Sequence, residues 1–353
     1  MKHAASYDEH LNRVSRSFAF CIKRLPQPLQ SEVALTYLIC RLLDTIEDAS
    51  WPSPEVQEEH FDRFDERLQN PTSRVNLPFD NLVSPLPSGE LKLIDFQDAL
   101  FADFHSLPPA SRDILFSTIQ SMSRGMRHFA LKRPENVLRL KSLLELNVYC
   151  FFVAGVIGEG LTLLFSKHEP TFSPSKDNLE LSVHFGLFLQ IINILKDYRS
   201  DEAEGRFFIH DKGVVLASLK THGYAALKYL LQIPSQQVGY RIFCAWSLFL
   251  GLFTLPRLVR TEGQDKISRP SRLQTWNFLR KVESRITDDA ALMELFDELM
   301  RRADLPTVLP DLDSSSLSLQ ILRDPTHKFS WVKKCYMGRL SLELGPIFGV
   351  SFH

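Results

Sequence analysis

Helical periodicity dominates this sequence and limits what the chain can fold into. Apolar residues recur at i, i+3, i+4 and i+7 around residues 31–48, 111–131, 140–166, 178–200, 236–260 and 271–302. This spacing places apolar side chains on one face of an α-helix, whereas the alternation typical of strands is scarce. Breaks rich in proline and serine fall at 70–89, 169–175 and 304–316, the first long enough to be a surface excursion. We therefore expect an all-α fold whose helices enclose a core or a cavity.

Charge and cysteine usage exclude several classes of protein. The 41 lysine and arginine residues nearly balance 42 acids, so no overall positive field favours nucleic acid. Five scattered cysteines without metal-ligand spacing fit a reducing compartment. The N-terminus lacks an apolar signal core. The longest uncharged apolar run, 242–256, is shorter than the ~20 residues that span a bilayer, which favours a buried core helix. We expect a cytoplasmic protein, with peripheral membrane contact as an alternative, and the oligomeric state is left open.

An apolar helix around 31–48 ends in three acids, Asp44, Glu47 and Asp48. Asp44 and Asp48 are spaced i, i+4, so their carboxylates share one helix face and destabilise it by a few tenths of a kcal/mol. A solvated face is the simplest interpretation of one such pair, but the preceding "VALTYLICRLL" is too apolar for an exposed helix. A second pair, Asp197 and Asp201, ends the apolar helix "FGLFLQIINIL" in the same way.

Two matched aspartate pairs predict a Mg²⁺-diphosphate site. Mg²⁺ prefers octahedral oxygen coordination and is usually held by one or two carboxylates, phosphate oxygens and water. Facing helices of a bundle are a common place for such a site. Basic residues lie near both pairs: Arg16, Arg41, Lys196 and Arg206. Each of them could simply form a salt bridge with the same acids, but together they suit a leaving diphosphate.

The segment between the acid pairs, "YCFFVAGVIGEGLTLLF" (149–165), contains three glycines and several aromatic residues. The glycine spacing is not a dinucleotide-binding fingerprint, and small residues here favour close packing or room for a bulky ligand chain. Tyr149 and its neighbours could be ordinary core residues, or their ring faces could stabilise a carbocation. No Ser-His-Asp arrangement, P-loop or H-E-x-x-H motif is present.

Four segments in this order resemble the motifs of the squalene/phytoene synthase family, most nearly its squalene synthase branch: "SRSFAF", "YLICRLLDTIED", "YCFFVAGVIGEGLTLLF" and "FGLFLQIINILKDYRSDEAEGRFF". The resemblance runs from about residue 15 to about residue 269. It implies a single-domain isoprenoid synthase fold with helices around a central cavity, over residues 1–303, and leaves 304–353 as a C-terminal extension of unknown role.

The resemblance also implies a prenyltransferase of the farnesyl-diphosphate farnesyltransferase type. In the squalene branch, two farnesyl diphosphates condense head to head with Mg²⁺ to presqualene diphosphate, and NADPH then reduces the rearranged carbocation to squalene. The metal ligands would be Asp44, Asp48, Asp197 and Asp201. The catalytic residues would be Tyr149 as proton acceptor, Tyr37, Arg41 and Arg206. The substrate-binding residues would be Ser15, Arg16, Ser17, Phe18, Gln190 and Asn193. The cofactor-binding residues would be Lys196, Lys266 and Arg269.

Some positions depart from the family's pattern. Ala49 stands where a further acid is common, and Ile191, Ile192 and Lys196 change the polar segment before the second pair. "FFIH" follows "GR", where an acid, an aromatic residue and a proline are common. These departures leave the diphosphate chemistry intact and weaken the inference of NADPH. The chain also has no counterpart of the C-terminal membrane helix of eukaryotic relatives, which favours a prokaryotic-type soluble or peripheral enzyme.

Other functions share these motifs. Presqualene diphosphate, dehydrosqualene and phytoene synthases differ in the fate of the cation or in prenyl chain length. A relative of another class would be a non-catalytic assembly factor or lipid-binding scaffold. Such a protein would be expected to lose the acid pairs, which this chain keeps.

Overall fold

The structure is a computed structural model, and it describes residues 1–133, 137–260, 270–306 and 330–337. The first half of the chain forms α1 (Ala4–Val14), α2 (Arg16–Ile22), α3 (Leu29–Asp48), α4 (Pro54–Gln69), α5 (Ser88–Asp95), α6 (Gln97–His105), α7 (Pro109–Leu131), strand β1 (Leu138–Arg139), α8 (Leu143–Cys150), the π-helix η2 (Phe151–Gly155) and α9 (Val156–His168). The second half forms α10 (Lys176–Ala203), β2 (Arg206–Phe207), α11 (Lys212–Gln232), α12 (Val238–Arg260), α13 (Arg272–Glu283), α14 (Asp289–Ala303) and α16 (Ser330–Cys335). The predicted all-α fold is confirmed.

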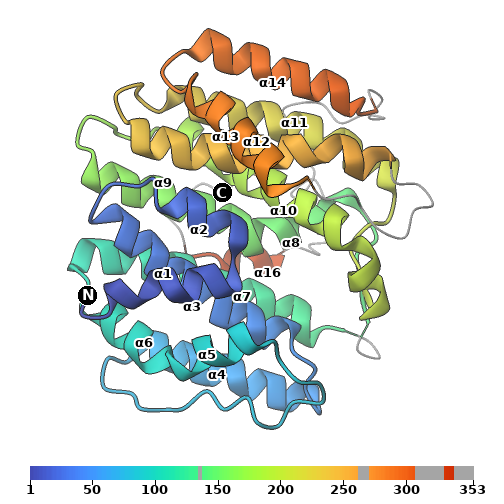
Figure 1. The fold of residues 1–353 in the computed structure, drawn as a ribbon. Coiled ribbons are helices and arrows are strands. Elements are labelled where there is room, and N and C mark those ends of the chain that lie inside the picture. The colour runs from blue at the N-terminus through green and yellow to red at the C-terminus, as the bar shows by residue number, and fades with distance from the viewer. Residues whose placement is uncertain (134–136, 261–269, 307–329, 338–353) are drawn as a thin grey trace.

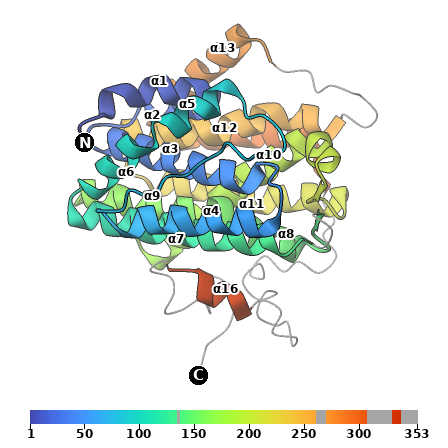
Figure 2. The ribbon, with the colours of Figure 1, turned by 90° about the horizontal axis from the view of Figure 1, so that it is seen from below.

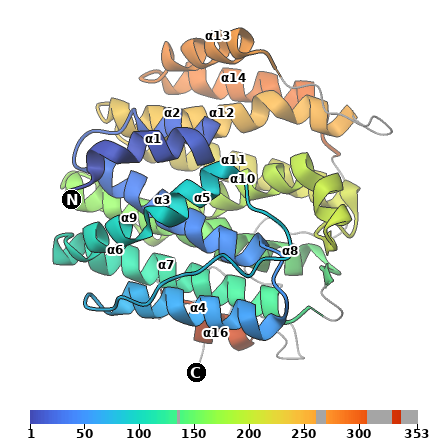
Figure 3. The ribbon, with the colours of Figure 1, turned by 60° about the horizontal axis from the view of Figure 1, so that its bottom comes forward.

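The helices stack in layers, with α10 in the interior (Figures 1 and 3). α10 packs against α9, α11, α12 and η2. α3 packs against helices from the first half of the chain, chiefly α1, α6 and α7. α4 and α7 lie at one side of the stack, and α13 and α14 lie at the other (Figure 3). Two interior helices, α3 and α10, therefore carry the two aspartate pairs.

The apolar pattern of α3 explains its position in the core. Leu35, Leu38, Ile39, Leu42 and Ile46 repeat at helical spacing, and each is completely buried. Burying a Leu or Ile side chain contributes roughly 1.5–3 kcal/mol, so this stripe holds the helix against its neighbours. The helix continues to Asp48, so the predicted acids occupy its last turn.

The predicted helix at 140–166 is a continuous helical segment whose middle, η2, is π-helical. Its glycines allow close packing of backbones. A Cβ atom on Gly158 would lie 2.1 Å from the carbonyl oxygen of Ser182 in α10, and one on Gly186 would lie 2.3 Å from that of Ala154. The close-packing interpretation of these glycines is confirmed, because any larger residue would separate α9 from α10.

The helix predicted over 271–302 is wrong as one element, because the chain breaks into α13 and α14. Asp288 caps α14: its side chain accepts a hydrogen bond from the backbone N–H of Ala291. An N-cap residue has non-helical backbone angles, so a helix begins there rather than continuing. The predicted excursion at 70–89 is free of helix and strand as far as Pro87, and Ser88 begins α5.

Three helical segments are long and apolar enough to cross a membrane by length and composition: Leu143–His168, Lys176–Ala203 and Val238–Val259. Between 67% and 78% of their most apolar windows is buried inside the structure. The run 242–256 lies within α12, where Trp246, Leu248, Phe249 and Leu252 are buried. The prediction of a core helix is confirmed by this burial, although the whole of α12 is longer than the run that suggested it.

Part of the predicted C-terminal extension packs on the outside of α7 (Figure 2). In α16 the ring of Trp331 stacks on His128 at 3.4 Å between centroids and lies 5.3 Å from Phe152. The hydroxyl of Tyr336 donates a hydrogen bond to Glu159. The domain boundary at 303/304 and the role of the extension stay predictions.

Candidate functional site

The ends of α3 and α10 meet, and one guanidinium joins them. Arg206 in β2 places Nη1 3.1 Å from Oδ1 of Asp48 and Nη2 2.8 Å from Oδ1 of Asp201. Asp48 and Arg206 are 158 residues apart in the chain. Because one guanidinium reaches both carboxylates, Asp48 of the first pair and Asp201 of the second lie within a few ångströms of each other, as the sequence predicts for facing helices.

A glycine and a short sheet position Arg206. Gly205 ends α10 with φ of 76°, a left-handed conformation that glycine adopts without a Cβ penalty. The chain then turns into β2, which pairs in parallel with β1 through Leu138 and Arg139. The side chain of Arg206 is thereby directed back at Asp201, four positions before Gly205.

The first pair has its own arginine. Arg41 lies 3.5 Å from Asp44, and its Nε and Nη2 both donate to Oε1 of Glu90, at 3.0 and 2.7 Å. Thr45 donates to the other oxygen of Glu90 at 3.3 Å. Glu90 belongs to α5 and is buried. Arg41 is therefore held in one orientation beside Asp44 by an acid from a separate helix.

The carboxylates at the end of α3 repel one another and are partly shielded from water. Although 30% of the Asp44 side chain is exposed, burial raises the pKa of its carboxyl to about 7, Arg41 opposes this rise, and Asp48 adds to it. Burial, then Asp48, raises the pKa of Glu47 to about 8. A divalent cation would relieve both the repulsion and the desolvation, so the donor set fits Mg²⁺. In the described ranges no three His, Cys, Asp or Glu side chains form a metal site by themselves.

Tyr149 lies beside this cluster, at the end of α8. Its hydroxyl donates to Oε1 of Glu47 at 3.4 Å. Phe129 meets its ring edge to face at 5.2 Å between centroids, and Phe208 lies 4.8 Å away on a tilted plane. Burial and the charges of Glu47 and Asp48 raise the pKa of Tyr149 well above its ordinary value. The phenol is thus fixed by aromatic neighbours and stays protonated until a positive charge or a proton acceptor arrives.

The residues around "SRSFAF" come together at the start of α2. The side chain of Ser15 accepts a hydrogen bond from the backbone N–H of Phe18 at 3.3 Å. The rings of Phe18 and Tyr37 lie 5.9 Å apart, and Tyr37 precedes Arg41 by one turn of α3. Burial raises the pKa of Tyr37 to about 12. Arg16 and Ser17 begin α2, but their side chains lie outside the described part of the structure.

Gln190, Asn193 and Asp197 follow one another along α10 at helical spacing. Lys196 donates to Oδ1 of Asn193 at 3.2 Å and lies 3.3 Å from Asp197. Lys266 and Arg269 lie outside the described residues. Of the predicted cofactor-binding residues, the structure therefore describes the side chain of Lys196 alone.

Two residues near the acids had no signal in the sequence. Glu90 is one acid in an ordinary amphipathic segment, and its link to Arg41 spans 49 positions. Arg133 follows α7 and places Nη2 3.8 Å from Oε1 of Glu47. Neither belongs to a motif with characteristic spacing, so only their position in space reveals them.

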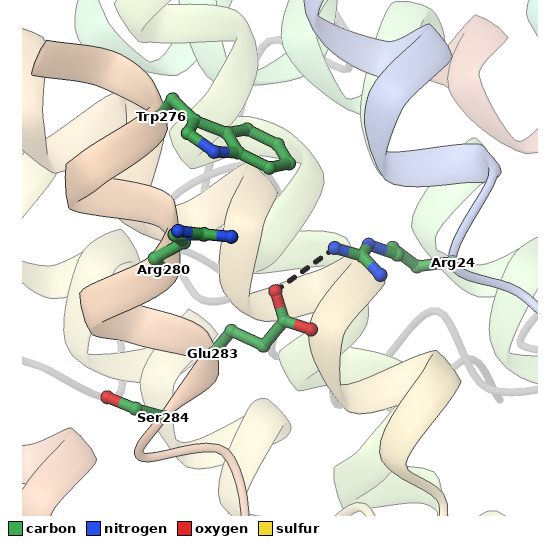
Figure 4. Close-up of a pocket in the computed structure, with 5 residues that line it drawn as sticks. All are labelled: Arg24, Trp276, Arg280, Glu283 and Ser284. Atoms are coloured by element: carbon green, nitrogen blue, oxygen red, sulfur yellow. Dashed lines mark hydrogen bonds and ion pairs between the residues drawn. The ribbon is translucent and has the colours of Figure 1, made fainter. Parts of the chain in front are cut away.

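A hollow of about 420 Å³ lies elsewhere, between the end of α2 and α13 (Figure 4). Its lining residues are Arg24, Trp276, Arg280, Glu283 and Ser284. Arg24 is paired with Glu283 at 3.0 Å and also lies 4.4 Å from the ring of Trp246. None of these residues belongs to the aspartate pairs or to their ion-pair partners, so this hollow is separate from the candidate site.

Comparisons with known proteins identify the family and the fold. Residues 11–210 match the family model "Squalene/phytoene synthase". Over 200 residues the chain is 36% identical to the squalene synthase of Eremothecium gossypii and 34% identical to squalene synthase ERG9 of Saccharomyces cerevisiae. These alignments cover 56% and 57% of this chain but 44% of each relative, so the match spans less than half the length of these proteins. Both relatives are fungal, and the prokaryotic type stays a prediction.

Solved structures share the fold. The structure of TcSQS with the ligand BPH1237 has a TM-score of 0.72 at 22% identity, covering 89% of this chain and 94% of that one. A dehydrosqualene synthase in complex with a ligand has a TM-score of 0.55 at 16% identity, covering 81% and 96%. These similarities establish that the helices are arranged as in those proteins.

Proposed function

Because the chain belongs to the squalene/phytoene synthase family, we propose that it is a squalene synthase. It would condense two farnesyl diphosphates head to head, with Mg²⁺, and complete the reaction with NADPH. The observation that carries this proposal is the junction of the two aspartate pairs through Arg206. A pair at the end of each of two facing helices supplies carboxylates for two Mg²⁺-bound diphosphates within one site.

Each part of the site has a role in ionising the substrate. Asp44 and Asp48 would hold the metal at one diphosphate, and Asp197 and Asp201 would hold it at the other. Bound Mg²⁺ supplies neutralisation of the charge that develops on the leaving diphosphate. Arg41 stays charged and directed at this place because Glu90 holds two of its donors. Such preorganised donors stabilise a developing negative charge without reorganisation.

We propose that Tyr149 accepts the proton lost in the first condensation while its own hydroxyl proton passes to the released diphosphate. Its hydroxyl lies next to the acid turn of α3, so released diphosphate would lie within reach of it. Phe129 and Phe208 surround the ring. Their aromatic faces would stabilise an adjacent carbocation and exclude water, which would otherwise capture it.

The reductive half of the proposal depends on NADPH. NADPH supplies a hydride, and this chain would contribute cations for its phosphates and a dry cavity for the transfer. Lys196 is already bound to Asn193 and Asp197. This arrangement favours, as a second candidate, a synthase that ends at presqualene diphosphate or at a non-reduced hydrocarbon. The product of either enzyme would carry long apolar prenyl chains, so we propose a cytoplasmic protein with peripheral membrane contact.

Chromatography of products tests the proposal. We expect squalene from farnesyl diphosphate, Mg²⁺ and NADPH, and presqualene diphosphate or rearranged products without NADPH. An identical product spectrum with and without NADPH would remove the reductive step. No Mg²⁺-dependent release of diphosphate would instead support the scaffold alternative.

Two matched variants test the metal ligands. Asp44→Asn and Asp197→Asn each remove one charge from a different pair, and we expect turnover to fall by roughly two orders of magnitude or more while neither variant unfolds. A single-turnover assay measures the rate of the reaction, and calorimetry measures the melting temperature. Together they separate an effect on catalysis from an effect on fold stability. Near-wild-type turnover in either folded variant would contradict the assignment.

A further inference from the structure

We propose that Arg133 is a further diphosphate-binding arginine, which holds a phosphate oxygen between the acid turn of α3 and Tyr149. This inference rests on the proposed function, since it assigns a further contact to the same substrate. No motif in the sequence contains Arg133, and it lies about two residues beyond the end of α7.

The backbone of α7 orients Arg133. Its Nε donates to the carbonyl oxygen of Phe129 at 3.3 Å, in the last turn of α7. A cation at the C-terminal end of a helix is also favoured by the helix dipole. Phe129 packs its ring against Tyr149, so one residue fixes both the guanidinium and the phenol.

One donor of Arg133 has no hydrogen-bond partner. Nη2 is buried, and the nearest carboxylate oxygen, Oε1 of Glu47, lies 3.8 Å away, which is an ion pair rather than a hydrogen bond. Burying an unpaired charged donor is unfavourable, so such a group in a native site calls for a ligand or a water.

The same oxygen of Glu47 accepts from the hydroxyl of Tyr149. Arg133 and Tyr149 therefore reach one point from two different elements. Glu47 lies between Asp44 and Asp48 on the acid turn, where the substrate's diphosphate would be held. An anionic oxygen entering here would meet the unpaired Nη2 of Arg133 and the hydroxyl of Tyr149 together.

Arg133 differs in this respect from the other two arginines. Arg41 already makes two hydrogen bonds to Glu90, and Arg206 is bound to both Asp48 and Asp201. Of these three side chains, Arg133 is the one with a buried donor still unpaired. Its Nη2 can bind phosphate without first breaking a hydrogen bond to a carboxylate.

Titration calorimetry with inorganic diphosphate and Mg²⁺ tests this inference directly, without turnover. We expect Arg133→Met to weaken diphosphate binding about tenfold or more, because a charge-assisted hydrogen bond is lost. Arg133→Lys should recover part of the affinity, since it keeps the charge but loses the planar donor geometry. The control is Arg127→Met in the preceding helix α7, where Arg127 pairs with Glu58 and Asp62 on an exposed face. It should bind as the wild type does.

The outcomes separate this inference from the function on which it rests. Wild-type affinity for diphosphate in Arg133→Met would overturn the role of Arg133 while leaving the proposed function in place. If the wild type itself fails to bind Mg²⁺-diphosphate, the proposed function falls first. If Arg133→Met does not fold, Arg133→Lys decides: unchanged affinity overturns the proposal, and a severalfold loss supports it. A mere counter-ion of Glu47 would alter kcat with no loss of diphosphate affinity.

Discussion

At the scale of single residues, the ionisation of Asp44 and Glu47 links the stability of the fold to ligand binding. Both carboxyls have a raised pKa, about 7 for Asp44 and about 8 for Glu47, chiefly because of burial. A raised pKa means that the folded chain binds protons which the unfolded chain releases at lower pH. These groups therefore stabilise the fold in their protonated form, and this contribution is lost as pH rises from about 4 through their folded-state values.

This sign gives a testable pH dependence. Without metal, we expect Asp44→Asn to gain stability relative to the wild type between pH 5 and pH 7, by up to about 2 kcal/mol, because the amide cannot ionise. Chemical denaturation at several pH values measures the difference. With Mg²⁺ and diphosphate the order should reverse, because only the wild type keeps both charges of the pair. A difference that does not change with pH would show that Asp44 ionises normally in the fold.

A second prediction concerns Tyr149, where substitution by phenylalanine removes only the hydroxyl group. In Tyr149→Phe the ring keeps its packing with Phe129 and Phe208, while the hydroxyl that donates to Glu47 is lost. We expect farnesyl diphosphate to bind with nearly unchanged affinity and the cyclopropyl intermediate not to form. Binding of a non-reactive analogue and detection of presqualene diphosphate measure the two effects. Formation of the intermediate at the wild-type rate would make Tyr149 an ordinary core residue.

At the scale of elements, the contact between α9 and α10 depends on the absence of side chains. A Cβ atom on Gly158 would lie 2.1 Å from the backbone oxygen of Ser182, and backbone atoms cannot move aside as a flexible side chain can. The position of α10, and with it that of Asp197 and Asp201, follows from this close approach.

We therefore expect Gly158→Ala to lower the free energy of unfolding by about 1–3 kcal/mol or more, the usual cost of overpacking. Gly213→Ala is the matched control, because the nearest atom to its added Cβ, at 3.3 Å, belongs to the side chain of Asp211. Chemical denaturation of both variants gives the comparison. Equal stabilities would mean that α9 and α10 can separate at little cost.

At the scale of the whole molecule, helices that follow the family match in the chain complete the core around α10 and the candidate site. The family match ends at residue 210, yet α11 and α12, which follow it, cover further faces of α10. Near the other end of the described chain, α16 adds Trp331 next to Phe129, with ring centroids 5.5 Å apart. Phe129 in turn contacts Tyr149, so α16 supports the outer side of the candidate site.

This packing predicts a measurable effect far along the chain from the acids. Trp331→Ala should lower the free energy of unfolding, by less than the about 3–5 kcal/mol typical of a fully buried Trp, because Trp331 is only partly buried. It should also raise the mobility of Phe129, which NMR of labelled phenylalanine would detect. Unchanged stability would mean that the stacking on His128 contributes nothing to the fold.

The sequence alone determined features that depend on short spacings. The apolar stripe of α3 predicts its burial, and the i, i+4 spacing places Asp44 and Asp48 on one face, because helix geometry is set by neighbours along the chain. The glycines of 149–165 likewise favour close packing or room for a ligand chain, without identifying the residues that they contact. The single helix over 271–302 was wrong because α13 ends at Glu283 and a local cap at Asp288 begins a new helix, although the apolar spacing continues.

Only the tertiary structure decided which distant residues meet. The bridge from Arg206 to Asp48, the clamp of Glu90 on Arg41 and the approach of Arg133 to Glu47 join residues 158, 49 and 86 positions apart. No periodicity encodes such separations, because each depends on how whole helices pack. The raised pKa of Asp44 has the same origin: a carboxylate's charge costs free energy in proportion to its burial, and burial is a property of the packed chain.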